Sequence, residues 1–408
     1  LTVSFDTPVV LKAVEGVSIL PGVAFDSTNN RVVASYIDLT GSDNGLAQVI
    51  KTGFSKDTGG TIADGSAVIV NANGTVSTVG PVDATGGTPV AFETGGQARY
   101  TSVAYDSANQ KVVVAYEDVS NSEYGTAIVG TVNASDNSIS FGSAAIFESA
   151  EVKYVAITYD SNAGKVVIAY SDGGNSDYGT AIVGTVSGTS ISFGSPTVFK
   201  SGNTDYIRIV YDSNAQKVVI FYQDTSDSAR GECLVGTVSG TSISFGSATD
   251  FGGVFAYDIN CVFDSTNNKV IGFFRDVNDG TRGKANVGTV SGTSISFGGE
   301  VTFNATDTEF ISATFDTSSG KVVVAYRDTA NSDQGMAIVG TVSGTSISFG
   351  SEVAFDNTAI ADTTAVYDPN ANKTLIVYKD IDNSNYLTAI VGTVSGTSIS
   401  FGSEIVLD

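Results

Sequence analysis

The stretch Tyr159-Asp-Ser-Asn-Ala-Gly-Lys-Val-Val-Ile-Ala-Tyr170 decides the fold, because this chain of 408 residues repeats its pattern. Each copy has an aromatic residue followed by Asp, and five residues after that Asp a Lys or Arg begins an apolar run. Successive copies lie 80, 54, 52, 52, 52 and 52 residues apart. The sequence is therefore an array of seven units, the first of which carries an insertion. The Asp residues that mark the copies are Asp26, Asp106, Asp160, Asp212, Asp264, Asp316 and Asp368.

The composition of one unit predicts four antiparallel β-strands. Short runs rich in β-branched and aromatic residues are separated by turns of Gly, Asn, Asp and Ser, and no run has helical periodicity. Seven such meanders packed around an axis give an all-β fold, a seven-bladed β-propeller with four antiparallel strands per blade. A linear solenoid is the alternative, although it leaves unpaired strand edges. In the third unit the predicted strands are 155–159, 165–170, 180–186 and 190–193.

The array predicts one domain over residues 1–408, with a β-hairpin insertion in the first blade over residues 54–80. The ring is expected to be closed by a terminal strand. Residues 1–5 and residues 398–401 both resemble the fourth strand of a unit. One of them should pair across the seam, and the other is then spare for a fifth strand or for another subunit.

Two parts of the unit are expected to be structural. The repeated Asp should accept hydrogen bonds from backbone N–H groups of the hairpin turn, with a weak ion pair to the Lys or Arg five residues later. The segment Gly-Thr-Val-Ser-Gly-Thr-Ser-Ile-Ser-Phe-Gly recurs without change five times and predicts a scaffold face. Its copies start at Gly184, Gly236, Gly288, Gly340 and Gly392.

The opposite face is expected to carry the variable loops, which are those between the second and third strands and those that lead from one unit to the next. Binding specificity usually resides in such loops. The candidate ligand-binding residues of this face are of two kinds. Three tyrosines late in the loops between the second and third strands could stack on a sugar ring or a partner surface, or pack on a neighbouring blade. The other four residues precede a repeated Asp at the end of the second strand, where chemical character changes from unit to unit. The seven candidates are Tyr124, Tyr178, Tyr386, Glu117, Arg275, Arg327 and Lys379.

Calcium is the one candidate cofactor. Oxygen-bearing side chains alternate at Asp276 and Asn278, and again at Asp380 and Asp382, as a calcium loop requires. Neither segment has the downstream Glu that completes a twelve-residue calcium loop. The repeated Asp at the end of each second strand is otherwise expected to cap its turn. The chain has no His, which excludes histidine-based catalysis and zinc sites that contain His.

The charge and composition of the chain limit the classes of partner that it can bind. The chain has 43 acidic and 20 basic residues, and the resulting net charge of −23 argues against nucleic acid and anionic membranes as partners. No apolar run is long enough to span a bilayer, so membrane insertion is not expected. Because the chain begins at Leu1, a targeting segment could already have been removed. Cys233 and Cys261 are expected to be buried thiols, with a disulfide as the alternative in a secreted protein.

The repeat resembles a known group of sequences. Segments such as Tyr-Asp-Ser-Asn-x-x-Lys-Val-Val-Ile-Ala-Tyr and Gly-Thr-Val-Ser-Gly-Thr-Ser-Ile-Ser-Phe-Gly-Ser are similar to repeat proteins of marine bacteriophages and ocean metagenomes. The Asn71-Ala-Asn-Gly74 region of the insertion is similar to pieces of the same proteins. The resemblance covers nearly the whole chain. It implies a virion-associated or surface-exposed protein, such as a tail-fibre or receptor-binding component, and it supplies no catalytic residue.

These observations together predict a non-enzymatic binding propeller at a virion or extracellular surface. Its variable face would recognise a cell-surface glycan or protein. A structural subunit of a virion or extracellular filament is the second hypothesis, in which the spare strand and the insertion contact virion proteins or further copies of the chain as a homo-oligomer. A carbohydrate-active enzyme is the third.

Overall fold

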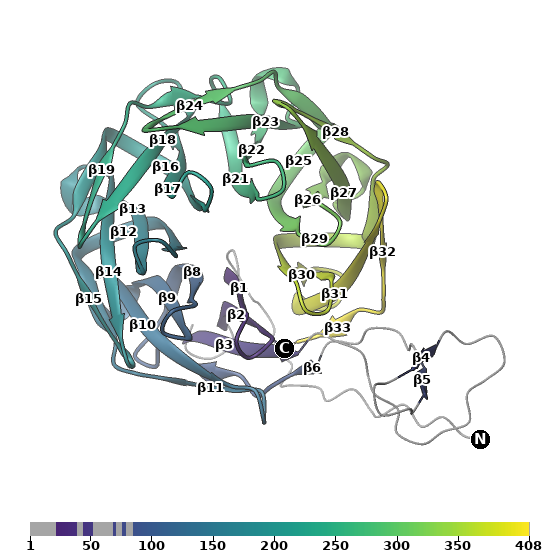
Figure 1. Cartoon of the computed structure of the whole chain (residues 1–408), viewed down its shortest axis with the longest axis horizontal. Coiled ribbons are helices and arrows are strands. Elements are labelled where there is room, and N and C mark those ends of the chain that lie inside the picture. Colours follow the sequence, from purple (N-terminus) through teal and green to yellow (C-terminus); the bar gives the residue numbers. More distant parts are fainter. Residues whose placement is uncertain (1–21, 39–43, 52–67, 71–75, 79–84, 408) are drawn as a thin grey trace.

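The computed structural model describes residues 22–38, 44–51, 68–70, 76–78 and 85–407. This part of the chain is built from antiparallel β-sheets, with four short 3-10 helices among the described residues. Figure 1 shows the sheets arranged around a central axis, with one strand of each unit nearest that axis and the last strands at the rim. The innermost strands are β1 (Gly22–Asp26), β8 (Ala98–Asp106), β12 (Ala145–Asp160), β16 (Thr197–Asp212), β21 (Ala256–Asp264), β25 (Val301–Asp316) and β29 (Val353–Asp368).

The next two strands of each unit follow outward in chain order. The second strands are β2 (Arg31–Asp38), β9 (Lys111–Asp118), β13 (Lys165–Asp172), β17 (Lys217–Asp224), β22 (Lys269–Asp276), β26 (Lys321–Asp328) and β30 (Lys373–Asp380). The third strands are β3 (Asn44–Lys51), β10 (Tyr124–Asn133), β14 (Tyr178–Ser187), β18 (Arg230–Ser239), β23 (Arg282–Ser291), β27 (Gln334–Ser343) and β31 (Tyr386–Ser395).

Short elements complete the sheets. The fourth strands are β11 (Ser138–Phe141), β15 (Ser190–Phe193), β19 (Ser242–Phe245), β24 (Ser294–Phe297), β28 (Ser346–Phe349) and β32 (Ser398–Phe401). The 3-10 helices between second and third strands are η1 (Val119–Asn121), η2 (Gly173–Asn175), η3 (Val277–Asp279) and η4 (Thr329–Asn331). The remaining strands are β4 (Val68–Val70), β5 (Val76–Thr78), β6 (Thr85–Gly86), β7 (Val90–Ala91), β20 (Thr249–Asp250) and β33 (Ile405–Val406).

The connection from one unit to the next is extended strand rather than the expected loop. In β12 the first residues pair with β10, where Ala145 lies opposite Ala127. From Val152 onward the same strand pairs with β13 of the following unit. β16, β25 and β29 cross between units in the same way. The crossing links neighbouring units into two large hydrogen-bonded sheets, which do not join into one closed sheet.

The core lies between neighbouring units. Every second strand is buried along nearly its whole length because both of its faces pack on other sheets. Along β13, Val166, Ile168 and Tyr170 pack with residues of the preceding unit, whereas Val167 and Ala169 pack with residues of the following one. Alternate side chains of one strand therefore take part in two separate interfaces, one with each neighbouring unit.

The first and last units also share a core. Residues of β2 and β3, including Ala34 and Tyr36, belong to one apolar cluster with Leu375 and Val377 of β30. The C-terminal strands β32 and β33 both pair with β31, so the C-terminus supplies the outer strands of the last unit. Residues 1–21 lie outside the described residues. In the insertion, β4 and β5 pair antiparallel as a two-stranded sheet, and most of the remaining insertion lies outside the described ranges.

The hairpin prediction is confirmed in one part and wrong in the other. All seven repeated Asp residues accept N–H hydrogen bonds from the residues two and three positions later, as Asp160 does from Asn162 and Ala163. No ion pair joins these Asp residues to their basic partners among the residues with described side chains. Instead, three of the lysines donate to a threonine hydroxyl on the third strand, as Lys269 does to Thr289 over 2.8 Å.

Neither cysteine is in a disulfide, which confirms the expectation of free thiols. Cys233 is buried on β18, and Cys261 on β21 faces the central axis. Burial raises the pKa of Cys261 to about 12. Both thiols are therefore poorly ionised at neutral pH.

No helix in the described ranges is long and apolar enough to cross a membrane.

The unchanging segment of the repeat forms a contact between units. Its last residue, a glycine, lies against the carbonyl oxygen of a threonine in the corresponding turn of the next unit. A Cβ atom at Gly298 would lie 1.9 Å from Thr345 O, and one at Gly350 would lie the same distance from Thr397 O. These separations are far below van der Waals contact, so only glycine fits. The copies that start at Gly184, Gly236, Gly288 and Gly340 each contribute the glycine to one such contact and the threonine carbonyl to another, which explains why the segment is constant.

Replacing Gly298 by Ala is expected to lower the free energy of unfolding by about 1–3 kcal/mol, because the methyl group must push the neighbouring turn away. Gly299→Ala is the matched control, since a Cβ there meets nothing within 4 Å. Urea unfolding of the two variants measures the difference. Equal stabilities of the two variants would contradict this contact.

Candidate functional site

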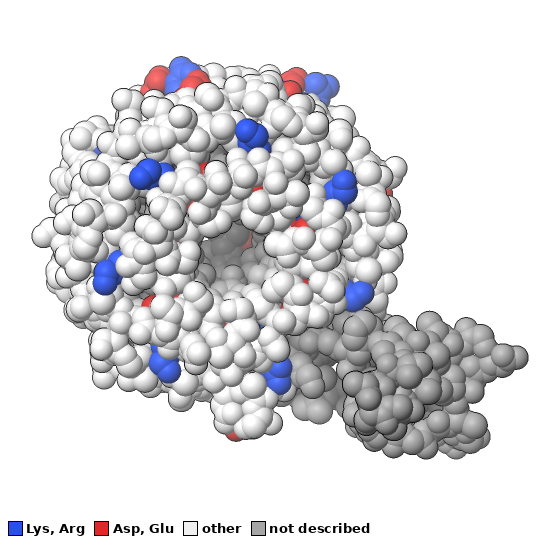
Figure 2. Space-filling view, in the orientation of Figure 1, with Lys and Arg blue, Asp and Glu red and all other residues white. Residues whose placement is uncertain are grey.

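The innermost strands enclose a central cavity of about 210 Å³. Figure 2 shows the molecule hollowed at its centre, with basic side chains standing apart from one another around the opening. Equivalent positions of the innermost strands line the cavity, and most of them carry a short polar side chain or arginine. The residues at these positions are Gly22, Ser102, Ala156, Arg208, Asn260, Ser312 and Thr364.

The polar side chains at these positions tie neighbouring units together. The hydroxyl oxygen of Ser102 accepts from the N–H of Ile157 over 3.2 Å, and Ser312 accepts from Ala365 over 3.0 Å. Arg208 departs from this pattern. Its guanidinium donates to the carbonyl of Ile207, and no carboxylate of the described side chains lies within ion-pair distance of it. The cavity leaves Arg208 in contact with some water, yet the surrounding protein lowers its pKa.

One mouth of the cavity carries a row of aromatic side chains, here called the aromatic collar and made of Tyr100, Tyr154, Tyr206 and Tyr257. Neighbouring ring centroids lie 5.2, 5.5 and 5.8 Å apart along the row, in tilted and edge-to-face arrangements. All four rings are half-buried, so part of each remains open to solvent. Such partly exposed rings can stack on an apolar face of a ligand.

Three of the four collar tyrosines have a strained backbone conformation. Tyr100, Tyr154 and Tyr206 have φ values of 47°, 52° and 48°, in the left-handed region that few residues other than glycine adopt. The pairing of the innermost strand with the second strand is irregular at the same point, as between Arg99 and Ser102. A bulge therefore interrupts each strand where it reaches the mouth. Strain of this kind collects at functional sites, because the surrounding structure must enforce it.

Beyond the collar the mouth carries a charged network. Glu309 bridges two arginines: its carboxylate receives the Arg275 guanidinium at 2.6 Å and also pairs with Arg327. Arg275 lies 5.9 Å from the ring centroid of Tyr257, and Arg327 lies over Phe310. Burial raises the pKa of Asp258, next to Arg275, to about 6. The two predicted arginines therefore lie at the mouth, where each is in contact with a carboxylate and an aromatic ring of the protein.

The other predicted residues of the second strands are also at this mouth. Glu117 lies opposite Arg99 on the adjacent strand, with the ionic groups 3.9 Å apart, but its side chain is only 2% exposed. Lys379 lies opposite Ala361, is half-buried, and forms no ion pair with a described side chain. The mouth therefore gathers Glu117, Arg275, Arg327 and Lys379 from four different units.

The three predicted tyrosines occupy another position. Tyr124, Tyr178 and Tyr386 are the first residues of β10, β14 and β31, opposite the Asp that ends the second strand of the same unit. They are half-buried and are not members of the collar. The collar residues were not singled out from the sequence. A signal was present, because an aromatic residue closes several of the variable segments, but nothing local revealed that a bulge would turn it toward the axis.

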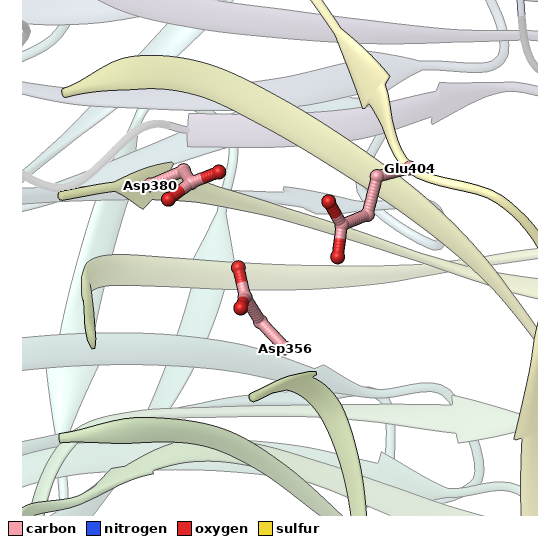
Figure 3. Close-up of side chains that lie close together, drawn as sticks. All are labelled: Asp356, Asp380 and Glu404. Atoms are coloured by element: carbon pink, nitrogen blue, oxygen red, sulfur yellow. The ribbon is translucent and has the colours of Figure 1, made fainter. Parts of the chain in front are cut away.

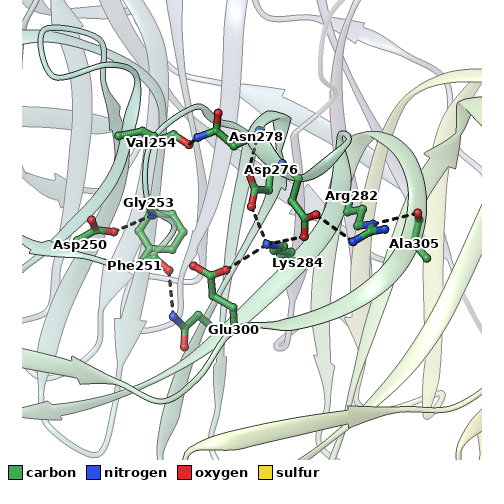
Figure 4. Close-up of polar contacts among 12 residues, drawn as sticks. Asp250, Phe251, Gly253, Val254, Asp276, Asn278, Arg282, Lys284, Glu300 and Ala305 are labelled. Atoms are coloured by element: carbon green, nitrogen blue, oxygen red, sulfur yellow. Dashed lines mark hydrogen bonds and ion pairs between the residues drawn. The ribbon is translucent and has the colours of Figure 1, made fainter.

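The two pairs of predicted calcium ligands lie at the ends of two second strands and in the turns that follow them. Asp276 already receives the ammonium of Lys284 at 2.6 Å, and Asn278 donates its side-chain amide to the carbonyl of Val254, as Figure 4 shows. Asp380 lies beside two other carboxylates, whereas Asp382 is exposed and is not part of that group. The cap interpretation of the repeated Asp is confirmed in most units, for example at Asp276, which accepts from two N–H groups of η3.

Comparison with solved structures identifies the fold. The BP39L lectin from Burkholderia pseudomallei aligns with a TM-score of 0.61 at 11% sequence identity, over 97% of this chain and 99% of that chain. The periplasmic gluconolactonase PpgL of Pseudomonas aeruginosa aligns at 0.54 and 10% identity, over 95% and 96% of the two chains. The β-propeller domain of Cps50 (Swd1) from Myceliophteria thermophila aligns at 0.53 and 8% identity, over 94% and 100%.

These structural similarities define the protein as a β-propeller. No protein-family profile matches the chain, and no curated protein sequence matches it. At such low identities the similarity establishes the fold and carries no site residue across. The neighbours include both lectins and lactonases, so a binding role and a catalytic role are both represented on this architecture.

Replacing Glu117 by Gln is expected to stabilise the protein above about pH 7 and to change little below about pH 4.5. Burial raises the pKa of Glu117 from 4.5 to about 7, so the folded state retains a proton that the unfolded state releases between these values. Wild-type stability therefore falls across this window, and that of the Gln variant falls less. The difference above the window should not exceed about 3 kcal/mol.

Urea unfolding at both ends of the window measures this difference. Glu123→Gln is the matched control, because Glu123 contacts the same Arg99 from a more exposed position. A gain in stability from Glu117→Gln that is equal at both pH values would contradict the assignment.

Proposed function

We propose that the chain is a closed seven-bladed propeller forming one domain over residues 1–408, with residues 54–80 as an insertion in its first blade. Seven repeats of the sequence pattern support the number of blades. Closure is supported by the apolar cluster that joins β2 and β3 to β30 and β31, and by the hydrogen bond from the Asn370 side chain to that of Asn30. Packing of side chains, rather than pairing of a terminal strand across the seam, would then hold the ends together.

Electron microscopy of the purified protein tests this arrangement. Class averages viewed along the central axis are expected to show seven lobes in a complete ring. Six or eight lobes, or an open ring, would contradict it.

The function that this geometry supports best is non-enzymatic binding of a cell-surface glycan, or of a protein receptor, at the mouth of the cavity. The observation that carries this proposal is the aromatic collar, whose half-exposed rings are held by strained backbone in a row. Sugar rings present C–H faces that stack on such side chains. The charged residues around the collar add directional hydrogen bonds, which supply specificity.

The outer tyrosines are a second part of the proposed surface. Tyr124, Tyr178 and Tyr386 lie on the same variable face as the collar, at the start of the third strands. A long glycan could contact both. Lys379 is the predicted cation with the fewest competing partners, since no described acid pairs with it.

We place the protein at an extracellular or virion surface, with no role in binding nucleic acid. The net charge of −23 and the scattered basic residues of Figure 2 argue against binding of nucleic acid. The similarity of the repeat to marine phage sequences supports the surface location, with a tail fibre or another virion component as the setting. A structural subunit that contacts virion proteins, or further copies of the chain, is the alternative.

Glycan-array binding tests the proposed function. The wild-type chain is expected to bind a defined set of glycans, and Tyr154→Ala should weaken that binding about tenfold, because it removes one stacking face. Tyr154→Phe is the matched control and should retain most of the affinity. Absence of binding to every glycan and receptor tested would favour the structural subunit.

The same experiment addresses catalysis. Bound glycans should be recovered intact, and marine polysaccharides incubated with the protein should gain no reducing ends. Release of new reducing ends that depends on the folded chain would replace the binding proposal with a carbohydrate-active enzyme.

A further inference from the structure

An acidic pocket recurs between neighbouring units where the second strand ends, and lysine neutralises it in two of them. In the unit of β22 to β24, the ammonium of Lys284 lies 2.6 Å from Asp276, 3.0 Å from Asp279 and 3.3 Å from Glu300 (Figure 4). In the unit of β17 to β19, Lys200 enters from the crossing strand. It pairs with Asp224, and with Glu232 at 3.1 Å.

The pocket of the last unit has the acids without the lysine. Asp356 stands at the position of Lys200, since these residues lie opposite equivalent glycines, Gly335 and Gly179. Thr388 stands at the position of Lys284, opposite Tyr378 on the second strand. No Lys or Arg of the described side chains forms an ion pair with the acids of this pocket. Their charge is therefore not compensated by the protein around them.

Three carboxylates converge in this pocket. Asp356, Asp380 and Glu404 each offer an oxygen atom, and these oxygens lie within 4.8 Å of one another. Figure 3 shows the three carboxyl groups pointing toward a shared space. Asp356 comes from the crossing part of β29, Asp380 ends β30, and Glu404 precedes β33. The three residues are brought together by the fold and not by a sequence motif.

One of these oxygens accepts no hydrogen bond although it is deeply buried, and the hydroxyl of Tyr378 near it is also without a hydrogen bond. Asp356 is 3% exposed, and its Oδ1 accepts from the N–H of Thr358 at 2.8 Å and from the Thr358 hydroxyl at 2.6 Å. Its Oδ2 accepts no hydrogen bond. A buried carboxylate oxygen without a donor is costly unless a cation compensates it. Burial and the neighbouring acids also raise the pKa of Asp380 and Glu404.

We propose that Asp356, Asp380 and Glu404 bind a calcium ion, which takes the place that a lysine ammonium fills in the equivalent pockets. Oxygens that share one calcium ion at about 2.4 Å lie up to about 4.8 Å apart, in agreement with the separation of these carboxylates. Glu404 is exposed, so water can complete the coordination shell. Magnesium requires a smaller and more regular shell and should bind more weakly.

The ion would have a structural role in this position. Asp356 lies on the strand that crosses from the preceding unit, and Glu404 lies on the C-terminal segment. A calcium ion would therefore link the last two units and the chain end across one pocket. Of the ligands predicted from the sequence, Asp380 is retained in this site, whereas Asp276, Asn278 and Asp382 are not part of it.

Calorimetric titration of the chelator-treated full chain with calcium chloride tests the proposal. Wild-type protein should bind one calcium ion per chain, and its unfolding temperature should rise with calcium concentration. Asp380→Asn should weaken binding about tenfold or more. Asp356→Lys imports the lysine of the equivalent pocket, so it should abolish the response to calcium while the protein stays folded.

Asp328→Asn is the matched control, because Asp328 ends the second strand of another unit and should not affect calcium binding. Circular dichroism checks that each variant is folded before titration. The proposal fails if the wild-type chain binds no calcium, if Asp380→Asn and Asp356→Lys bind calcium as the wild type does, or if magnesium produces an equal response.

Discussion

Each four-stranded sheet of this protein has two apolar faces, and burial of both faces is the constraint on which the rest of the structure depends. A sheet with one apolar face could stand against solvent, but a strand such as β13 contributes to clusters on both of its sides. Burying one such face is worth many kcal/mol, since each fully buried aliphatic side chain contributes about 1.5–3 kcal/mol. Every unit therefore requires a neighbour on both sides. A chain of such units leaves two faces exposed unless its ends meet, and residues of the first and last units belong to one apolar cluster.

The same constraint explains which parts of the fold could be predicted from the sequence. Strands, turns and the hairpin Asp residues are encoded within a few residues, and the repeat presents the same local information again and again. The constant glycine was predicted only as scaffold, because its reason lies in the next unit, at a threonine carbonyl about fifty residues away. The sequence predicts loops at the crossing strands, because the variable residues in them have no strand pattern. Their conformation comes from pairing with a different partner at each end.

The candidate sites show this limit more sharply. Arg275 and Arg327 occupy equivalent positions near the ends of the second strands of adjacent units. Nothing in their neighbourhood along the chain indicated that Glu309 would bridge them. The collar depends on bulges with positive φ at tyrosines, which are unfavourable locally and are enforced by the packing around the axis. Residue type marks such positions weakly, whereas the packing of neighbouring units around the central axis determines them.

Differences between equivalent positions are more informative in this protein than the repeats themselves. One pocket contains Lys200 and another contains Lys284, whereas the pocket of the last unit contains Asp356 and Thr388 at the equivalent positions. A cation from solution would neutralise the acids of the last pocket, as a lysine ammonium does in the pockets of Lys200 and Lys284. Such a cation would connect Asp356, Asp380 and Glu404, which come from three separate segments of the last two units.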